Sequence, residues 1–138
     1  MLPGFYPTRF FSHLLILICV LVTGVALFVP SLGMYGMSAL FLSLGDYGQF
    51  LLQLIFFQFL HGGIFHLLMN AYFLYQIGPE VEMRMSPSQF RLFFALNTIF
   101  TAVALLIFAP NVNTIGISGF AMAILTYLYA DLLSVRHP

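Results

Sequence analysis

The chain has 138 residues, of which 62% are apolar and only 6% are charged, and its four acidic and four basic side chains give a net charge of zero. Soluble domains are roughly half apolar and about a quarter charged, so this composition excludes a water-facing surface over most of the molecule. The four basic residues are scattered arginines, which argues against a nucleic-acid partner because they form no basic patch. We therefore expect an integral membrane protein whose main solvent is the lipid bilayer.

Three segments are long and apolar enough to cross a bilayer as helices, which takes about 20 apolar residues. They cover residues 11–29, 90–109 and 115–133. Pro30 closes the first segment and Pro110 closes the second, and proline ends a helix because it lacks the backbone N–H group. Each segment is therefore expected to be a transmembrane helix.

A fourth apolar stretch, residues 49–78, is too long for one upright helix and is interrupted at His61. We divide it there. The first part, residues 49–60, is expected to be an interfacial helix that ends an interfacial loop of residues 30–60. The second part, residues 63–82, is expected to be the second of four spans, which makes the fold class an all-α, polytopic helical bundle.

The arginines indicate how these spans are oriented. Four crossings place both termini and the loop over residues 78–89 on one side of the membrane. All four arginines fall on that side: Arg9, Arg84, Arg91 and Arg136. Under the positive-inside rule this side is cytoplasmic, so we expect cytoplasmic N- and C-termini in the cell membrane. The loops over residues 30–48 and 110–114 then face outward.

Polar side chains in the second span point to function or to helix packing. His66 and Asn70 are four residues apart and share one face of a helix, whereas helical spacing would turn His61 about 140° away from His66. Intramembrane polar groups face protein or a wet cavity, and here they either bond neighbouring helices together or serve chemistry. No metal site is expected, because the two histidines share no face and no Cys, Asp or Glu lies at ligand spacing.

The last span opens with Gly116, Ile117, Ser118 and Gly119. Small residues allow membrane helices to approach closely, and Gly119 with Ala123 forms such a row, so packing is one interpretation. Catalysis is the other. Ser118 is expected in the first turn of a helix, where unpaired N–H groups and the positive end of the dipole favour a developing oxyanion.

Three sequence runs together resemble the rhomboid family of intramembrane serine proteases. They are His61-Gly-Gly-Ile-Phe-His66-Leu-Leu-Met-Asn70, Gly78-Pro-Glu-Val-Glu82-Met-Arg84 and Gly116-Ile-Ser118-Gly119. Each run is a weak signal alone, but their order, spacing and expected depth within a four-span frame make the combination specific. The resemblance covers nearly the whole chain from Phe11 onward.

This resemblance implies a Ser–His dyad enzyme that cleaves the transmembrane segments of other membrane proteins. Ser118 matches the nucleophile, and His66 with Asn70 match the side chains that help the Ser118 backbone N–H group to stabilise the oxyanion. His61, Gly116 and Gly119 match structural positions, and Glu82 matches a carboxylate that fastens the cytoplasmic end of the second span. The chemistry implied requires no metal or organic cofactor.

Two departures from the family pattern matter. Leu52 and Gln53 stand where the family often has a Trp–Arg pair. The dyad histidine is expected from a later span, and neither His13 nor His137 can replace it because both are expected on the cytoplasmic side. We therefore expect a truncated chain: one rhomboid-like membrane domain over residues 1–138, with four of six transmembrane helices.

Two functions are consistent with this pattern. One is an intramembrane serine endopeptidase whose dyad histidine lies beyond the 138 residues. The alternative is a catalytically inactive rhomboid-like protein that binds transmembrane clients. The presence of Ser118 favours the protease, and the missing histidine favours the inactive binder for the chain by itself.

Overall fold

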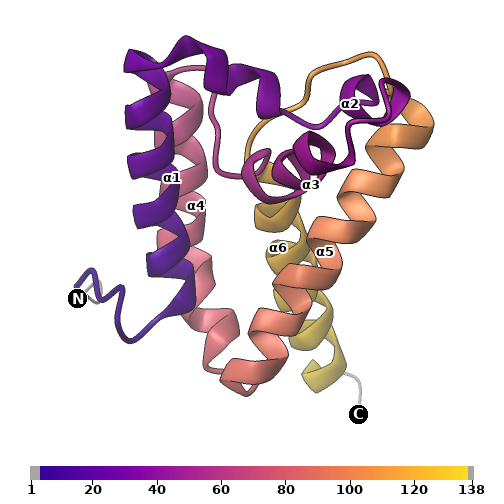
Figure 1. Cartoon of the computed structure of the whole chain (residues 1–138). Coiled ribbons are helices and arrows are strands. Elements are labelled where there is room, and N and C mark those ends of the chain that lie inside the picture. The colour runs from indigo at the N-terminus through magenta and orange to yellow at the C-terminus, as the bar shows by residue number, and fades with distance from the viewer. Residues whose placement is uncertain (1–3, 137–138) are drawn as a thin grey trace.

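The computed structural model describes residues 4–136, so His137 lies outside the described residues. Within this range the fold is all-helical, as expected (Figure 1). The elements are α1 (Phe11–Phe28), the 3-10 helix η1 (Pro30–Tyr35), α2 (Leu40–Ser43), α3 (Tyr47–Phe56), α4 (Ile64–Glu82), α5 (Pro87–Phe108) and α6 (Ser118–Arg136).

Local sequence signals set the ends of α5. Ser86 and Gln89 form a capping box, in which the Ser86 hydroxyl accepts from the Gln89 backbone N–H and the Gln89 side chain accepts from the Ser86 N–H. Pro87 occupies the first turn, where its missing N–H group costs nothing. The helix ends just before Ala109 and Pro110. Helix α5 begins three residues before the expected span of residues 90–109. The difference arises because the first turn of the helix is polar, so hydropathy alone does not assign it to the span.

The long helices pack in a chain of contacts. Helix α1 lies against α4, α4 lies against α6, and α6 lies against α5 (Figure 1). Phe120 is fully buried where these helices meet, and its ring contacts those of Phe90, Phe93 and Phe94 at centroid distances of 5.7, 5.7 and 5.0 Å. Edge-on aromatic contacts of this kind stabilise the junction of α5 and α6.

Among the described residues, three helices are long and apolar enough to cross a membrane: α1, α5 and residues Ser118–Val135 of α6. Large apolar side chains on them face outward, as lipid contact requires. Phe28, Phe100 and Phe108 are 88%, 75% and 85% exposed. The chain is therefore an integral, multi-pass membrane protein.

Helix α4 has 19 residues, one more than α1, but it is less apolar because several polar side chains interrupt it. These are His66, Asn70, Gln76, Glu80 and Glu82. Its expected crossing therefore stays a prediction.

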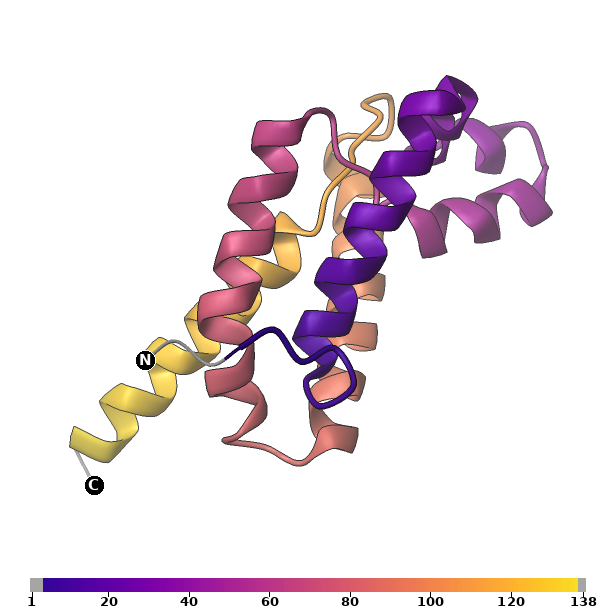
Figure 2. The same cartoon turned by 90° about the vertical axis from the view of Figure 1, so that its left-hand side faces the viewer.

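The two ends of the bundle differ. Helices α1 and α5 begin, and α4 and α6 end, at the lower end of Figure 1, whereas η1, α2, α3 and the α5–α6 loop gather at the upper end. Helix α3 runs across the long helices rather than along them (Figure 2). It ends at Phe56, earlier than the expected residue 60, and an irregular turn leads to α4.

Candidate active site

Backbone hydrogen bonds hold the loop that leads into α6. Met37 and Thr114 form an isolated antiparallel bridge, with N···O distances of 2.7 and 3.0 Å. Further along, the Gly116 N–H donates to the Phe57 carbonyl at 2.8 Å. The loop is thus fastened to the η1–α2 segment and to the α3–α4 turn, and α6 begins below the level at which α4 begins (Figures 1 and 2).

Ser118 is the first residue of α6, three residues later than the expected start of that span. Ile117 and Phe120 are fully buried, whereas Ser118 is exposed. The Ala121 N–H donates to the Ile117 carbonyl at 3.0 Å, so the N–H groups of Ser118 and the next two residues precede that first intrahelical bond. The turn therefore presents a serine hydroxyl together with backbone donors and the positive end of a helix dipole.

Gly116 brings two α4 side chains to this turn. Its φ of +112° is a conformation that favours glycine. A Cβ atom added there would lie 2.8 Å from His66 Cε1, 2.9 Å from His66 Nε2 and 3.6 Å from Asn70 Nδ2. The His66 ring and the Asn70 amide therefore both lie against the backbone two residues before Ser118. Helices α4 and α6, which correspond to the second and fourth expected spans, are in contact.

Asn70 is buried, and its Nδ2 atom has no hydrogen-bond partner among the described residues. Leaving a buried donor unpaired costs about 1–3 kcal/mol, so such groups are rare in proteins and often mark functional positions. An amide that merely joined two helices would be bonded. The Asn70 Nδ2 atom makes no hydrogen bond that would join α4 to a neighbouring helix among the described residues.

His61 does not lie where helical spacing would put it. Its ring packs edge-on against the His66 ring, with centroids 4.9 Å apart, so the expectation that it turns away from His66 is wrong. The reason is that α4 begins at Ile64 and the residues before it are not helical. His61 Nδ1 lies 3.3 Å from Thr23 Oγ1 and 3.2 Å from the Phe59 carbonyl oxygen. Burial lowers the pKa of His61 to about 4, so this ring is neutral at physiological pH.

Glu82 lies at the opposite end of the bundle. Its carboxylate accepts from the backbone N–H groups of Phe11 and Ser12, at 2.8 and 2.6 Å, and so caps the start of α1. Arg84 bonds to Glu80 and to Asp131 of α6, and these hydrogen bonds raise the pKa of its guanidinium. Both groups connect helices far from Ser118.

The sequence interpretation missed two residues that fix the loop beside the site. Gln53 is fully buried, and its Nε2 atom donates to the Gly36 carbonyl at 2.8 Å and to Ser38 Oγ at 3.2 Å. A Cβ atom on Gly36 would collide with the Asn113 side chain. A glutamine within an apolar helix was a usable signal for Gln53. Nothing in the local sequence marks Gly36.

Two other features would bear on chemistry at Ser118: a further histidine and a group of metal ligands. Neither is found there among the described residues. His13 is buried in α1, where its Nδ1 accepts from the Tyr6 N–H at 2.8 Å and its ring stacks on Tyr75. Within residues 4–136, no group of three His, Cys, Asp or Glu side chains is close enough to hold a metal ion. Gly119 faces Thr101 of α5, and an added Cβ atom would lie 3.4 Å from Thr101 Oγ1, an ordinary contact distance.

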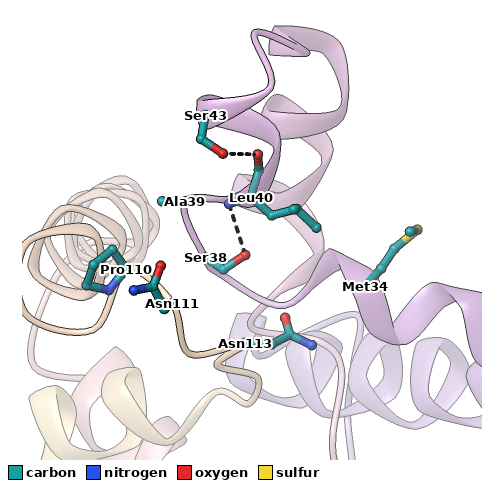
Figure 3. Close-up of a pocket in the computed structure, with 8 residues that line it drawn as sticks. All are labelled: Met34, Ser38, Ala39, Leu40, Ser43, Pro110, Asn111 and Asn113. Carbon is teal, nitrogen blue, oxygen red and sulfur yellow. Dashed lines mark hydrogen bonds between the residues drawn. The ribbon is translucent and has the colours of Figure 1, made fainter.

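A separate cavity of about 500 Å³ lies between the α5–α6 loop and the η1–α2 segment (Figure 3). Its lining comes from η1, α2 and that loop: Met34, Ser38, Ala39, Leu40, Ser43, Pro110, Asn111 and Asn113. The lining is uncharged, and the Ser43 hydroxyl bonds to the Leu40 carbonyl at 2.7 Å. Neither Ser118 nor His66 lines it, so this cavity is not the candidate active site.

Comparison with known families gives one match. The family model described as the Rhomboid domain matches residues 48–138, about two thirds of the chain. The chain belongs to the rhomboid family. No curated protein and no solved structure matches it.

Family membership confirms the resemblance carried by the three sequence runs and the all-helical fold class expected from the apolar segments. The rhomboid match begins in α3 and includes α4, α5 and α6, so Ser118, His66 and Asn70 all lie within it. Helix α1 and the η1–α2 segment precede the matched residues. The match is to a partial rhomboid domain of a family of intramembrane serine proteases.

Proposed function

We propose that this rhomboid protein is an intramembrane serine endopeptidase that cleaves the transmembrane segments of membrane proteins. Ser118 is the nucleophile, and His66 and Asn70 are the oxyanion donors. The observation that carries the proposal is that the His66 ring and the unpaired Asn70 amide lie against Gly116, beside the first turn of α6. A nucleophile, two side-chain donors and free backbone N–H groups are the parts that acyl transfer needs.

In the proposed reaction, Ser118 Oγ attacks the scissile carbonyl carbon and its proton passes to a histidine base outside residues 1–138. The Asn70 amide, a His66 ring N–H and the backbone N–H groups of the α6 turn hold the oxyanion. Collapse of the tetrahedral intermediate breaks the peptide bond, and the base returns the proton to the leaving amine. Water then hydrolyses the acyl-enzyme by the same route.

A four-crossing topology completes the proposal. With α4 as a span, both termini and the α4–α5 turn are cytoplasmic, and the cell membrane is the expected location. Ser118 then lies below the outer surface, where a transmembrane substrate could reach it. The arrangement of the helix ends supports this topology, because all three cytoplasmic segments lie at one end of the bundle (Figure 1).

The test is cleavage of a model transmembrane substrate in proteoliposomes by the product of the complete gene. Ser118→Ala should abolish cleavage. His66→Ala and Asn70→Ala should each reduce kcat by about 100-fold, the usual loss for one oxyanion donor. Ser43→Ala is a matched control, because this serine is exposed and bonds only within α2, and its activity should stay unchanged.

Residues 1–138 alone should not cleave the substrate, because within residues 4–136 the histidine placed against Gly116 is His66, which we assign to the oxyanion and not to the base. Cleavage by this segment that Ser118→Ala abolishes would make His66 the base and overturn the assignment of roles. If the complete gene product crosslinks to the substrate but never cuts it, the protein is the inactive binder of transmembrane clients.

A further inference from the structure

A charged cavity lies at the end of the bundle opposite Ser118. It has a volume of about 290 Å³ and is formed where α1 begins, α4 ends and α5 begins. Arg9, in the turn before α1, and Arg91, in α5, line it together with Thr8 and Glu82. The proposed protease reaction uses none of these side chains for chemistry.

The charge of this cavity is positive. Among residues 4–136, both ion pairs are made by Arg84, so neither Arg9 nor Arg91 has an acidic partner there. The Glu82 carboxylate is already bonded to the two backbone N–H groups at the start of α1. Two guanidinium groups and one carboxylate leave one net positive charge at the cavity.

The segment that carries Arg9 is held in place rather than left as a free tail. The Tyr6 carbonyl accepts from the N–H groups of Arg9 and Phe10, at 3.1 and 2.9 Å, and the Tyr6 N–H donates to the buried His13 ring. The Arg9 guanidinium lies over the Phe10 ring, 5.1 Å from its centroid. The turn therefore presents Arg9 at a fixed position beside the cavity.

The apolar wall of the cavity continues along the membrane-facing side of α1. Phe11 and Leu14 line the cavity, and Leu17 and Leu21 follow Leu14 at helical spacing with side chains that are 37% and 59% exposed. An acyl chain lying on this stripe would bring its headgroup to the two arginines.

We propose that this cavity binds the headgroup of a monoanionic phospholipid such as phosphatidylglycerol. Guanidinium groups bind phosphate oxygens through paired hydrogen bonds, and one net positive charge matches one phosphodiester. A zwitterionic headgroup would bring its own cation toward the arginines, and free phosphate would leave the apolar stripe uncovered. A headgroup bound there anchors the start of α1 and the end of α4, which Glu82 connects, at the membrane face where Arg9 and Arg91 lie.

The test is titration of the purified chain, in a neutral detergent, with short-chain phosphatidylglycerol, followed by native mass spectrometry. One lipid should bind, and the Arg9→Gln/Arg91→Gln double variant should bind it about 30-fold more weakly, from about 1 kcal/mol per arginine. Arg9→Lys/Arg91→Lys keeps both charges without the planar fork and should lose only a few-fold. Arg136→Gln, at the last residue of α6, removes one charge from a helix none of whose described side chains lines the cavity, and should change affinity less than two-fold.

Circular dichroism of each variant shows whether it folds as the unmodified chain does, and both arginines are exposed, so the fold should be kept. Equal binding of short-chain phosphatidylcholine would overturn the proposal. So would inorganic phosphate binding as tightly as the lipid, because the ligand would then be a free anion. An equal loss of lipid affinity in Arg136→Gln would show that binding depends on the general surface charge and not on this cavity.

Discussion

Gly116 joins an uncommon backbone conformation to contact with two α4 side chains. Its φ of +112° would strain any other residue, and the His66 ring occupies the place that a side chain would take. The motif glycine is therefore required twice, once for the turn into α6 and once for the approach of α4. Either effect alone would make substitution costly.

Gly116→Ala should lower the free energy of unfolding by about 2 kcal/mol, because the new Cβ atom is strained and meets the His66 ring. Titration with a denaturing detergent, followed by circular dichroism, measures this change. Gly24→Ala is the control, since nothing lies within 4 Å of an added Cβ atom there. It should be neutral or stabilising by up to about 1 kcal/mol, and an equal loss in both variants would contradict the contact.

Asn70 distinguishes a packing role from a catalytic one. Because its Nδ2 atom is buried without a partner, Asn70→Leu should leave the stability unchanged or raise it by about 1 kcal/mol, while cleavage by the complete gene product falls. The same denaturation experiment measures the stability. A clear loss of stability would show that Asn70 bonds the helices together.

At the scale of elements, the start of α6 depends on segments that precede α4. The Met37–Thr114 bridge fastens the α5–α6 loop to the η1–α2 segment, and Gln53 of α3 holds that segment through the Gly36 carbonyl. By the resemblance, Gln53 matches the second position of the Trp–Arg pair that the family often has, and its side-chain amide here donates to the Gly36 carbonyl.

Gln53→Leu should leave the Gly36 carbonyl unpaired and loosen this connection, with a loss of about 1–3 kcal/mol. Hydrogen–deuterium exchange should rise at the Met37 and Thr114 amides, which form the bridge. Gln49→Leu is the matched control on the same helix, because Gln49 bonds to the Tyr35 hydroxyl and does not reach Gly36. Unchanged exchange at the Met37 amide in the Gln53 variant would contradict the proposal that Gln53 supports the Met37–Thr114 bridge.

The junction of α1 and α4 at the other end depends on Glu82. Glu82→Gln removes a charged acceptor from two backbone N–H groups and should cost about 1–2 kcal/mol in the denaturation experiment. Glu80→Gln, in the exposed ion pair with Arg84, should cost less because solvent screens that pair. Equal losses would show that the carboxylate has no special part in capping α1.

At the scale of the whole molecule, the starts of α1 and α5 and the ends of α4 and α6 lie at one end of the bundle, which we propose to be cytoplasmic, and η1, α2 and α3 lie toward the other (Figures 1 and 2). A topology reporter fused after residue 86 or residue 138 should give a cytoplasmic signal, and one inserted at residue 111 should give an outer signal. An outer signal after residue 86 would show that α4 does not cross the membrane, and the four-span topology would then be wrong.

Much of this architecture follows from the sequence because its causes are local. A low charge content requires lipid contact, Pro30 and Pro110 stand where α1 and α5 have ended, and Ser86 with Pro87 begins α5. The motif residues likewise identify the rhomboid family from their order and spacing alone.

Contacts between distant segments were decided only by the tertiary structure. The Met37–Thr114 bridge, the collision that keeps Gly36 a glycine, and the cavity between Arg9 and Arg91 each join residues far apart in the chain. His61 shows the physical reason. Helical spacing describes a residue only while the chain is helical, and α4 begins three residues after His61, so packing alone set its ring against His66.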